Sequence, residues 1–109
     1  MPYDENLALK VSAILGNLPG ITVKKMFGGV GCLLNGNMAC GVHKEYLIVR
    51  VGPDQYQRAL EKPHVKVFDI TGRPMKGWVM VTPDGFASEV SLINWVQMGL
   101  DFASTLPPK

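Results

Sequence analysis

Apolar side chains recur at three- and four-residue steps near the N-terminus, which predicts an amphipathic helix. The expected stripe consists of Leu7, Val11, Ile14, Leu15 and Leu18. We expect this helix to cover residues 4–18. Asp4 and Glu5 stand where the helix dipole favours acids, and Pro19-Gly20 should stop the helix.

The same periodicity predicts a second long helix near the C-terminus. Ser88 is a good N-cap residue, so we expect the helix to run from there to about Ala103. The apolar residues expected around its buried face are Val90, Ile93, Trp95, Val96, Leu100 and Phe102. A shorter helix is predicted over residues 54–60, because Pro63 pushes Lys62 out of the helical region. Residues 106–109 are expected to form a loose tail.

Between the helices, apolar and β-branched runs bounded by turn residues predict strands. The strands are expected over residues 21–27, 30–34, 37–42, 46–51, 65–70 and 78–81. Asn35-Gly36 is expected to join the second strand to the third, because Asn-Gly accepts the two positive φ angles of a type I′ turn. The order α-β-β-β-β-α-β-β-α predicts one α+β domain over residues 1–109. Its two layers are an antiparallel sheet and helices mainly on one face of that sheet.

Composition adds the expectation of a partner. Hydrophobic residues make up 47% of the 109 residues and charged residues 18%, whereas charged residues typically make up about 25%. Part of the apolar surface is therefore expected to be covered by another molecule. One candidate interface is the third predicted strand, where Met38 and Cys40 are expected on one face and Ala39 on the other. Apolar residues on both faces suggest a homodimer.

Charge gives no clear indication of nucleic-acid binding. The net charge is +2 and the cations are scattered. The densest basic group is Lys62, His64 and Lys66, which we interpret as a solvated loop and edge strand. No apolar run approaches the roughly 20 residues that cross a bilayer, and the N-terminus is acidic where a signal peptide would be basic. We therefore expect a cytoplasmic protein without membrane contact, and the two cysteines agree with this.

The chain has enough sulfur and imidazole ligands for a tetrahedral zinc ion, namely Cys32, Cys40, His43 and His64. Their spacing disfavours a shared site. A two-residue turn at Asn35-Gly36 would pair Cys32 with Ala39 and Cys40 with Gly31, so that the two thiols point to opposite faces of the sheet. This register argues against both a metal site and a disulfide, and it depends on the length of that turn.

Other candidate chemistry is equally weak. Cys40 and His43 are three residues apart on a strand and should face opposite ways, which disfavours a nucleophile–base pair. The glycine-rich stretch at residues 27–31 precedes a strand, whereas phosphate loops precede a helix, so we interpret it as a bend. The acids fall mostly at caps and turns and form no evident pair: Asp54, Glu61, Asp69, Asp84 and Glu89. We expect no catalytic residue, no cofactor and no metal.

Aromatic residues lie on or beside the predicted strands: Phe27, Tyr46, Phe68 and Trp78. Some RNA-binding sheets stack bases on exposed rings at such positions. The alternation of aromatic, basic and glycine residues that marks those sheets is missing here. We therefore interpret these aromatic residues as parts of the core.

The stretch Lys24-Lys25-Met26-Phe27-Gly28-Gly29, followed by the Asn35-Gly36 hairpin, resembles the N-terminal domain of the TfoX/Sxy competence-regulator family. Further likeness comes from residues 46–50, residues 72–75 and Trp95 with Val96, so the resemblance extends from about Leu7 to Ala103. It implies a two-layer α/β fold, a bacterial origin and a role in gene regulation. Relatives place larger apolar residues at positions 39–41, where Ala39-Cys40-Gly41 leaves room for a helix or a partner to approach.

Full-length relatives act as positive regulators of DNA-uptake genes alongside the catabolite activator protein. They carry a second, helical C-terminal domain; the sequence here ends at Lys109, so we expect a stand-alone N-terminal domain. The resemblance supplies no catalytic residues. We expect Met26, Phe27, Gly28, Gly29, Asn35 and Gly36 to serve the fold, and Lys24, Lys25 and Arg73 to contact a protein or a phosphate backbone.

The leading hypothesis is a non-enzymatic regulatory module that acts by protein contact in transcription. The alternatives are a direct nucleic-acid-binding domain and a small-molecule-binding domain. They differ in what they require: nucleic-acid binding predicts a steep dependence on salt, and a small-molecule site requires a polar pocket.

Overall fold

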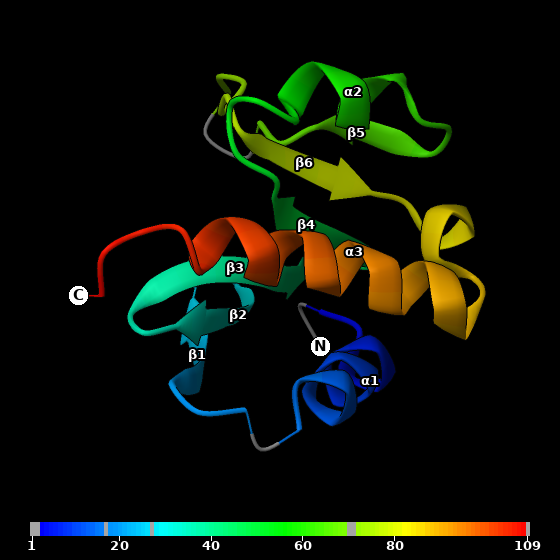
Figure 1. Ribbon diagram of the computed structural model, residues 1–109. Helices are drawn as coiled ribbons and strands as arrows, with labels where there is room; N and C mark the ends of the chain where they lie inside the picture. The colour runs from blue at the N-terminus through cyan, green and yellow to red at the C-terminus, as the bar shows by residue number, and fades with distance from the viewer. Residues whose placement is uncertain (1–2, 17, 27, 70–71, 109) are drawn as a thin grey trace.

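The computed structural model describes residues 3–16, 18–26, 28–69 and 72–108 (Figure 1). Its helices are α1 (Glu5–Leu15), α2 (Tyr56–Glu61) and α3 (Glu89–Ala103), with a 3-10 turn, η1 (Pro83–Phe86), before α3. Its strands are β1 (Ile21–Met26), β2 (Gly29–Leu34), β3 (Asn37–His43), β4 (Tyr46–Arg50), β5 (Val65–Val67) and β6 (Trp78–Val81). The predicted order of helices and strands is confirmed; η1 was not predicted.

The six strands form one open antiparallel sheet in the order β1-β2-β3-β4-β6-β5. One face, here called the core face, carries buried side chains that cluster with the buried residues of all three helices: Val42, Leu47, Val49, Val79 and Val81. In Figure 1, α3 passes across β3 and β4, α1 lies beside it, and α2 lies over β5 and β6. The opposite face, here called the open face, carries Gly41, Ile48 and Met80. The predicted two-layer α+β architecture is therefore confirmed.

Helix α1 begins where the sequence predicts and ends earlier. The Leu7 backbone N–H donates to the Asp4 carboxylate at 3.1 Å, so Asp4 is the N-cap. The helix ends at Leu15, and the prediction that it reaches Leu18 is wrong. Gly16 adopts a φ of 56°, a left-handed conformation that commonly ends helices. Leu18 consequently leaves the apolar stripe and is 47% exposed.

Helix α3 begins at the predicted cap, since the Ser91 N–H donates to the Ser88 hydroxyl at 3.1 Å. Its buried face differs from the prediction. The buried residues are Leu92, Trp95, Val96, Gly99, Leu100 and Ala103. Val90 is 68% exposed and Ile93 39% exposed, so the prediction that both lie on the buried face is wrong. The prediction relied on the large apolar residues of the helix, but the side that meets the sheet also contains small Gly99 and Ala103.

The β2–β3 hairpin has the predicted turn and an unpredicted bulge. Asn35 and Gly36 adopt φ angles of 52° and 85°, both in the left-handed region that a type I′ turn requires. Leu34 pairs with Asn37 and Leu33 with Met38, but the next pair is Cys32 with Cys40. Ala39 is therefore the extra residue of a β-bulge.

The bulge overturns two predictions at once. Cys32 and Cys40 do not point to opposite faces of the sheet; they lie directly opposite each other on the core face. Met38 and Cys40 do not share a face either, because the bulge places Met38 on the open face. Its Cε lies 2.9 Å from the position that a Cβ on Gly41 would take.

The bulged strand receives α3. A Cβ added to Gly99 would overlap the carbonyl oxygen of Ala39, so the helix backbone lies against the strand backbone. Room for a helix at Ala39-Cys40-Gly41 was one of the two alternatives that the sequence suggested, and α3 occupies it.

The remaining differences lie at element ends. Strand β5 stops at Val67, because Phe68 and Asp69 begin a turn in which the Gly72 N–H donates to the Asp69 carbonyl. Helix α2 begins at Tyr56, two residues later than expected. The Asn37 side chain, 2% exposed, donates to the Pro107 carbonyl at 2.9 Å, which ties the predicted tail to β3. The ends of the predicted first and fifth strands, Phe27 and Ile70, lie outside the described residues.

Candidate functional site

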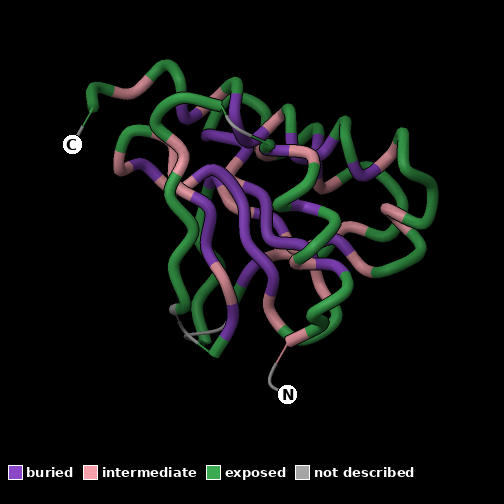
Figure 2. The backbone as a smooth tube through the Cα atoms, turned by 90° about the horizontal axis from the view of Figure 1, so that it is seen from below, coloured by how far each residue is buried: buried purple, intermediate pink, exposed green. Residues whose placement is uncertain are grey.

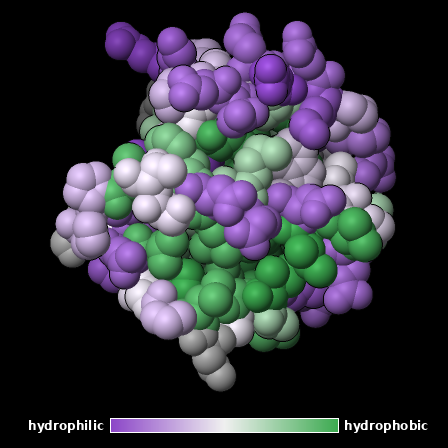
Figure 3. All heavy atoms as spheres, in the orientation of Figure 1, coloured by the Kyte–Doolittle hydropathy of each residue, from purple (hydrophilic) through white to green (hydrophobic). Residues whose placement is uncertain are grey.

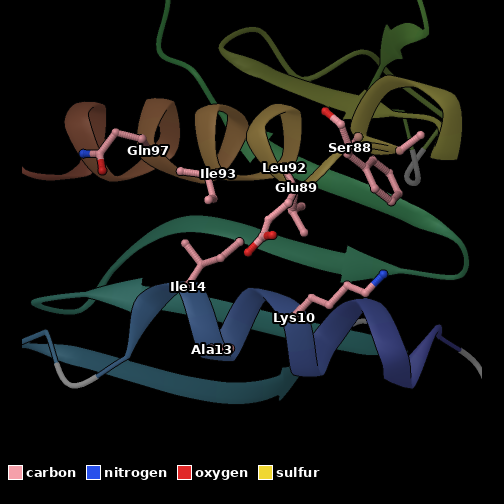
Figure 4. A pocket seen from close by; sticks show the side chains of 10 residues that line it. Lys10, Ala13, Ile14, Ser88, Glu89, Leu92, Ile93 and Gln97 are labelled. Atoms are coloured by element: carbon pink, nitrogen blue, oxygen red, sulfur yellow. The ribbon is translucent and has the colours of Figure 1, made fainter.

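A groove of about 640 Å³ separates α1 from α3 (Figure 4). Lys10, Ala13 and Ile14 line one bank, while Leu92, Ile93 and Gln97 line the other. Residues 86–89, which lead into α3, close one end. The groove exists because only a few residues of the two helices touch; each helix packs chiefly through its own buried stripe onto the core.

Large exposed apolar side chains stand next to the residues that line this groove. Leu9 is 69% exposed and stands one turn before Ala13. Val90, 68% exposed, stands one turn before Ile93 on the opposite bank. Figure 3 shows hydrophobic surface over the region between the two helices. Single exposed apolar residues are ordinary, whereas several around one groove are typical of an interaction site.

The charged residues that line the groove are Lys10 on α1 and Glu89 on α3 (Figure 4). One cation and one anion give the groove no strong sign. Apolar contact is therefore the main interaction that it offers, with the two charges available to orient an occupant.

The basic residues predicted as contacts do not form one surface. Lys24 and Lys25 are exposed on the edge strand β1, and consecutive strand residues point to opposite faces. Arg73 is exposed in the connection between β5 and β6, at the other edge of the sheet. These three residues are therefore not brought together.

The densest basic group is divided as well. The Lys62 ammonium lies 5.8 Å from the centre of the Trp95 ring, which belongs to α3. The Lys66 ammonium lies 5.8 Å from the centre of the Tyr46 ring, and both residues belong to the open face. The two lysines thus lie on opposite sides of the sheet.

The motif at Met26, Phe27, Gly28 and Gly29 connects β1 to β2. Met26 pairs with Gly29 across the reversal, and Gly28 has a φ of 74°. A Cβ on Gly29 would overlap the carbonyl oxygen of Val42, so the next strand requires a glycine there. A strand follows these glycines, as predicted, instead of the helix of a phosphate loop. Phe27 and the Met26 side chain lie outside the described part of the chain.

The aromatic residues were interpreted as core. Of the three that the structure describes, Phe68 agrees with this interpretation, since it is buried at 9% exposure. Tyr46 and Trp78 are half-buried on the open face. The centre of the Trp78 ring lies 6.1 Å from that of Phe68 and 5.1 Å from the guanidinium carbon of Arg50. The guanidinium carbon of Arg50 also lies 5.3 Å from the centre of the Phe102 ring of α3, so this side chain stands at the end of the sheet beside the helix. Tyr46, Trp78 and Lys66 place aromatic and cationic groups on the open face. The alternation of side chains along β4, which places Tyr46, Ile48 and Arg50 on one face, could have predicted these open-face positions from the sequence.

Of the four residues considered as zinc ligands, Cys32 and Cys40 lie together, whereas His43 and His64 do not join them. Within the described residues, no three His, Cys, Asp or Glu side chains lie close enough to hold a metal. Cys40 is on the core face and His43 on the open face, as the strand alternation predicts. His43 instead borders a cavity of about 230 Å³ with Tyr46, Asp69 and Met80.

Both thiols are reduced and buried, and they affect each other's ionisation. A hydrogen bond with the Cys40 thiol lowers the pKa of Cys32, against the opposing effect of burial. The same hydrogen bond, together with burial, raises the pKa of Cys40 well above its ordinary value.

The fold and the groove define a class of protein. It is a small α+β domain with helices on one face of its sheet, a positive-φ turn at Gly28 before β2 and an open groove between its two long helices. The family model described as the TfoX N-terminal domain matches residues 13–103. The chain therefore belongs to the TfoX N-terminal domain family, which is linked to the regulation of competence and DNA uptake. A search of curated proteins returned no match. Among the described residues, no helix is long and apolar enough to cross a membrane.

Proposed function

We propose that this chain is a cytoplasmic, non-enzymatic coregulator of DNA-uptake genes, and that the groove between α1 and α3 is its protein-contact surface. The observation that carries the proposal is the apolar lining on both banks, Ile14 on α1 and Leu92 with Ile93 on α3. Exposed Leu9 and Val90 each stand one helical turn from a lining residue. Leu92 and Ile93 belong to α3, which packs across β3 and β4. The groove is therefore presented by a rigid support, which lowers the cost of ordering on binding.

The groove suits an amphipathic helix of the partner. Helix-in-groove recognition places apolar residues of one helix face between two banks of apolar side chains. Here Ile14, Leu92 and Ile93 line the groove, and exposed Leu9 and Val90 extend the apolar surface one helical turn beyond the lining. Lys10 and Glu89 stand on opposite banks and would favour one direction of the incoming helix.

The partner we propose, by family analogy, is the catabolite activator protein bound to promoter DNA. The test is fluorescence anisotropy of a labelled DNA-uptake promoter fragment carrying an activator site. The activator is titrated in the presence and absence of this chain. We expect tighter activator–DNA binding with the chain present and no DNA binding by the chain alone. Unchanged activator affinity would contradict the proposed partner.

A second copy of the chain is the competing occupant of the groove. Light scattering, which measures molar mass, distinguishes a second copy from a different protein as the occupant when it is carried out over a wide concentration range. A concentration-dependent dimer that Val90→Asp abolishes would assign the groove to self-association. A monomer at all concentrations would leave the groove to a different protein.

Direct nucleic-acid binding is the second candidate, favoured by the open face. Tyr46 and Trp78 offer rings for base stacking, and Arg50 and Lys66 offer positive charge beside them. This candidate predicts binding of single-stranded nucleic acid that weakens steeply between low and moderate salt, because phosphate contacts release counterions. Absence of binding at low salt would eliminate it.

A further inference from the structure

The two cysteines of the chain are cross-strand neighbours. Cys32 of β2 and Cys40 of β3 occupy directly opposite positions on the core face, because the bulge at Ala39 shifts the register by one residue. Opposite residues of antiparallel strands have Cα atoms about 4.5–5.5 Å apart. Disulfides join Cα atoms roughly 4.4–6.8 Å apart. The pairing of the two strands therefore already holds the two Cα atoms within the range that a disulfide spans.

Access to the two thiols is unequal. Cys40 is fully buried between the sheet and α3. Cys32 is 2% exposed, and its neighbour on the edge strand is Val23, which is on the same face and 47% exposed. Only β1 thus separates Cys32 from solvent on that side. A brief opening of this edge strand, which pairs with β2 alone, would expose Cys32 and leave Cys40 covered.

The ionisation of the pair matches this difference in access. The thiol nearer to solvent has the lowered pKa and the deeper thiol the raised one. Since the thiolate is the reactive form, Cys32 is the thiol that an oxidant reaches first, and Cys40 is the resolving thiol because it lies directly opposite Cys32.

We propose that Cys32 and Cys40 form an oxidative modification site at which hydrogen peroxide generates a cross-strand disulfide. The Cys32 thiolate attacks one peroxide oxygen, the O–O bond breaks, and hydroxide leaves. The Cys40 sulfur then attacks the resulting sulfenic acid; the S–S bond forms, and the Cys40 proton leaves with the hydroxyl as water. Two thiols and one peroxide give one disulfide and two waters, so the thiols supply the two electrons that reduce the peroxide.

The site selects a small oxidant. The strand and helix backbones that meet at Ala39 and Gly99 leave no space for a side chain above this part of β3. A bulky disulfide such as oxidised glutathione would react through a mixed disulfide in which one glutathione is bonded to Cys32. Peroxide leaves a single oxygen atom there.

The test treats the native full chain with hydrogen peroxide, quenches it with catalase, and unfolds it in denaturant containing iodoacetamide. Intact mass spectrometry should find the mass of two hydrogens lost, no added alkyl group, and both thiols recovered after dithiothreitol. A folded chain that takes up two alkyl groups after the same treatment would overturn the proposal.

Two single variants test the order of events. In Cys40→Ser, the Cys32 sulfenic acid persists and is trapped by dimedone. In Cys32→Ser, oxidation of the remaining thiol should be at least about tenfold slower than in Cys40→Ser, since thiolate content and access both favour Cys32. Equal rates in the two variants would overturn the assigned roles. The wild-type measurement stands even if a variant fails to fold.

Discussion

The carbonyl oxygen of Ala39 in β3 lies against the α carbon of Gly99 in α3, at the bulged residue between Met38 and Cys40. The bulge pushes this carbonyl toward the helix, and the absence of a side chain at Gly99 lets the helix meet it. The contact fixes the position of α3, which carries one bank of the groove.

Gly99→Ala tests this contact. Alanine favours a helix over glycine by about 1 kcal/mol, so an unconstrained position would gain stability. Here the added Cβ would overlap the Ala39 carbonyl, and forced overpacking typically costs about 1–3 kcal/mol. We expect a net loss in the free energy of unfolding, measured by urea denaturation. Asn94→Ala, at an exposed position of the same helix, is the control and should be neutral or stabilising. A Gly99→Ala protein more stable than wild type would contradict the close contact.

The hairpin turn is tested at Gly36, whose φ is 85°. A β-branched residue is strained in the left-handed region, at about 1–3 kcal/mol. We expect Gly36→Val to lower the melting temperature by several degrees, as followed by circular dichroism. Asn35→Gly, which keeps the left-handed conformation accessible, should change it much less. Equal effects of the two substitutions would argue against a type I′ turn.

Asn37 connects the hairpin to the C-terminal segment. Its side-chain amide donates to Pro107, and the residue is almost fully buried. We expect Asn37→Ala to cost about 1 kcal/mol for the lost hydrogen bond and to raise amide hydrogen exchange in residues 104–106, which precede Pro107. Unchanged exchange in that segment would show that the contact does not hold it.

The fold was largely predictable because its signals are local. Helix caps at Asp4 and Ser88, the Asn35-Gly36 turn and the alternation along β4 each depend on a few neighbouring residues. The register of Cys32 with Cys40 was not predictable, because no neighbouring residue signals the bulge at Ala39, and the contact that accompanies it joins Ala39 to Gly99, 60 positions away. The candidate groove was missed for the same reason. Val90 and Ile93 are residue types that are usually buried. They are exposed here because Gly99 and Ala103 lie on the side of α3 that packs on the sheet.

The groove variants separate binding from folding. Val90→Asp places an acid in the first turn of α3, where the helix dipole favours it. Leu9→Arg replaces an exposed residue with a good helix former. Each should change stability by less than about 0.5 kcal/mol. Gln57→Glu, on the exposed surface of α2, is the matched control for an added charge outside the groove.

The central claim, that the α1–α3 groove contacts a regulatory protein, is tested most directly by the anisotropy titration repeated with these variants. Activator binding to the labelled promoter fragment is measured with wild-type chain, Val90→Asp, Leu9→Arg and Gln57→Glu. The account predicts that wild type and Gln57→Glu lower the Kd of the activator for the promoter fragment. Both groove variants should need at least about tenfold higher concentration to lower that Kd equally, because disrupting an apolar anchor commonly has an effect of this size. Groove variants that act as well as wild type would contradict it.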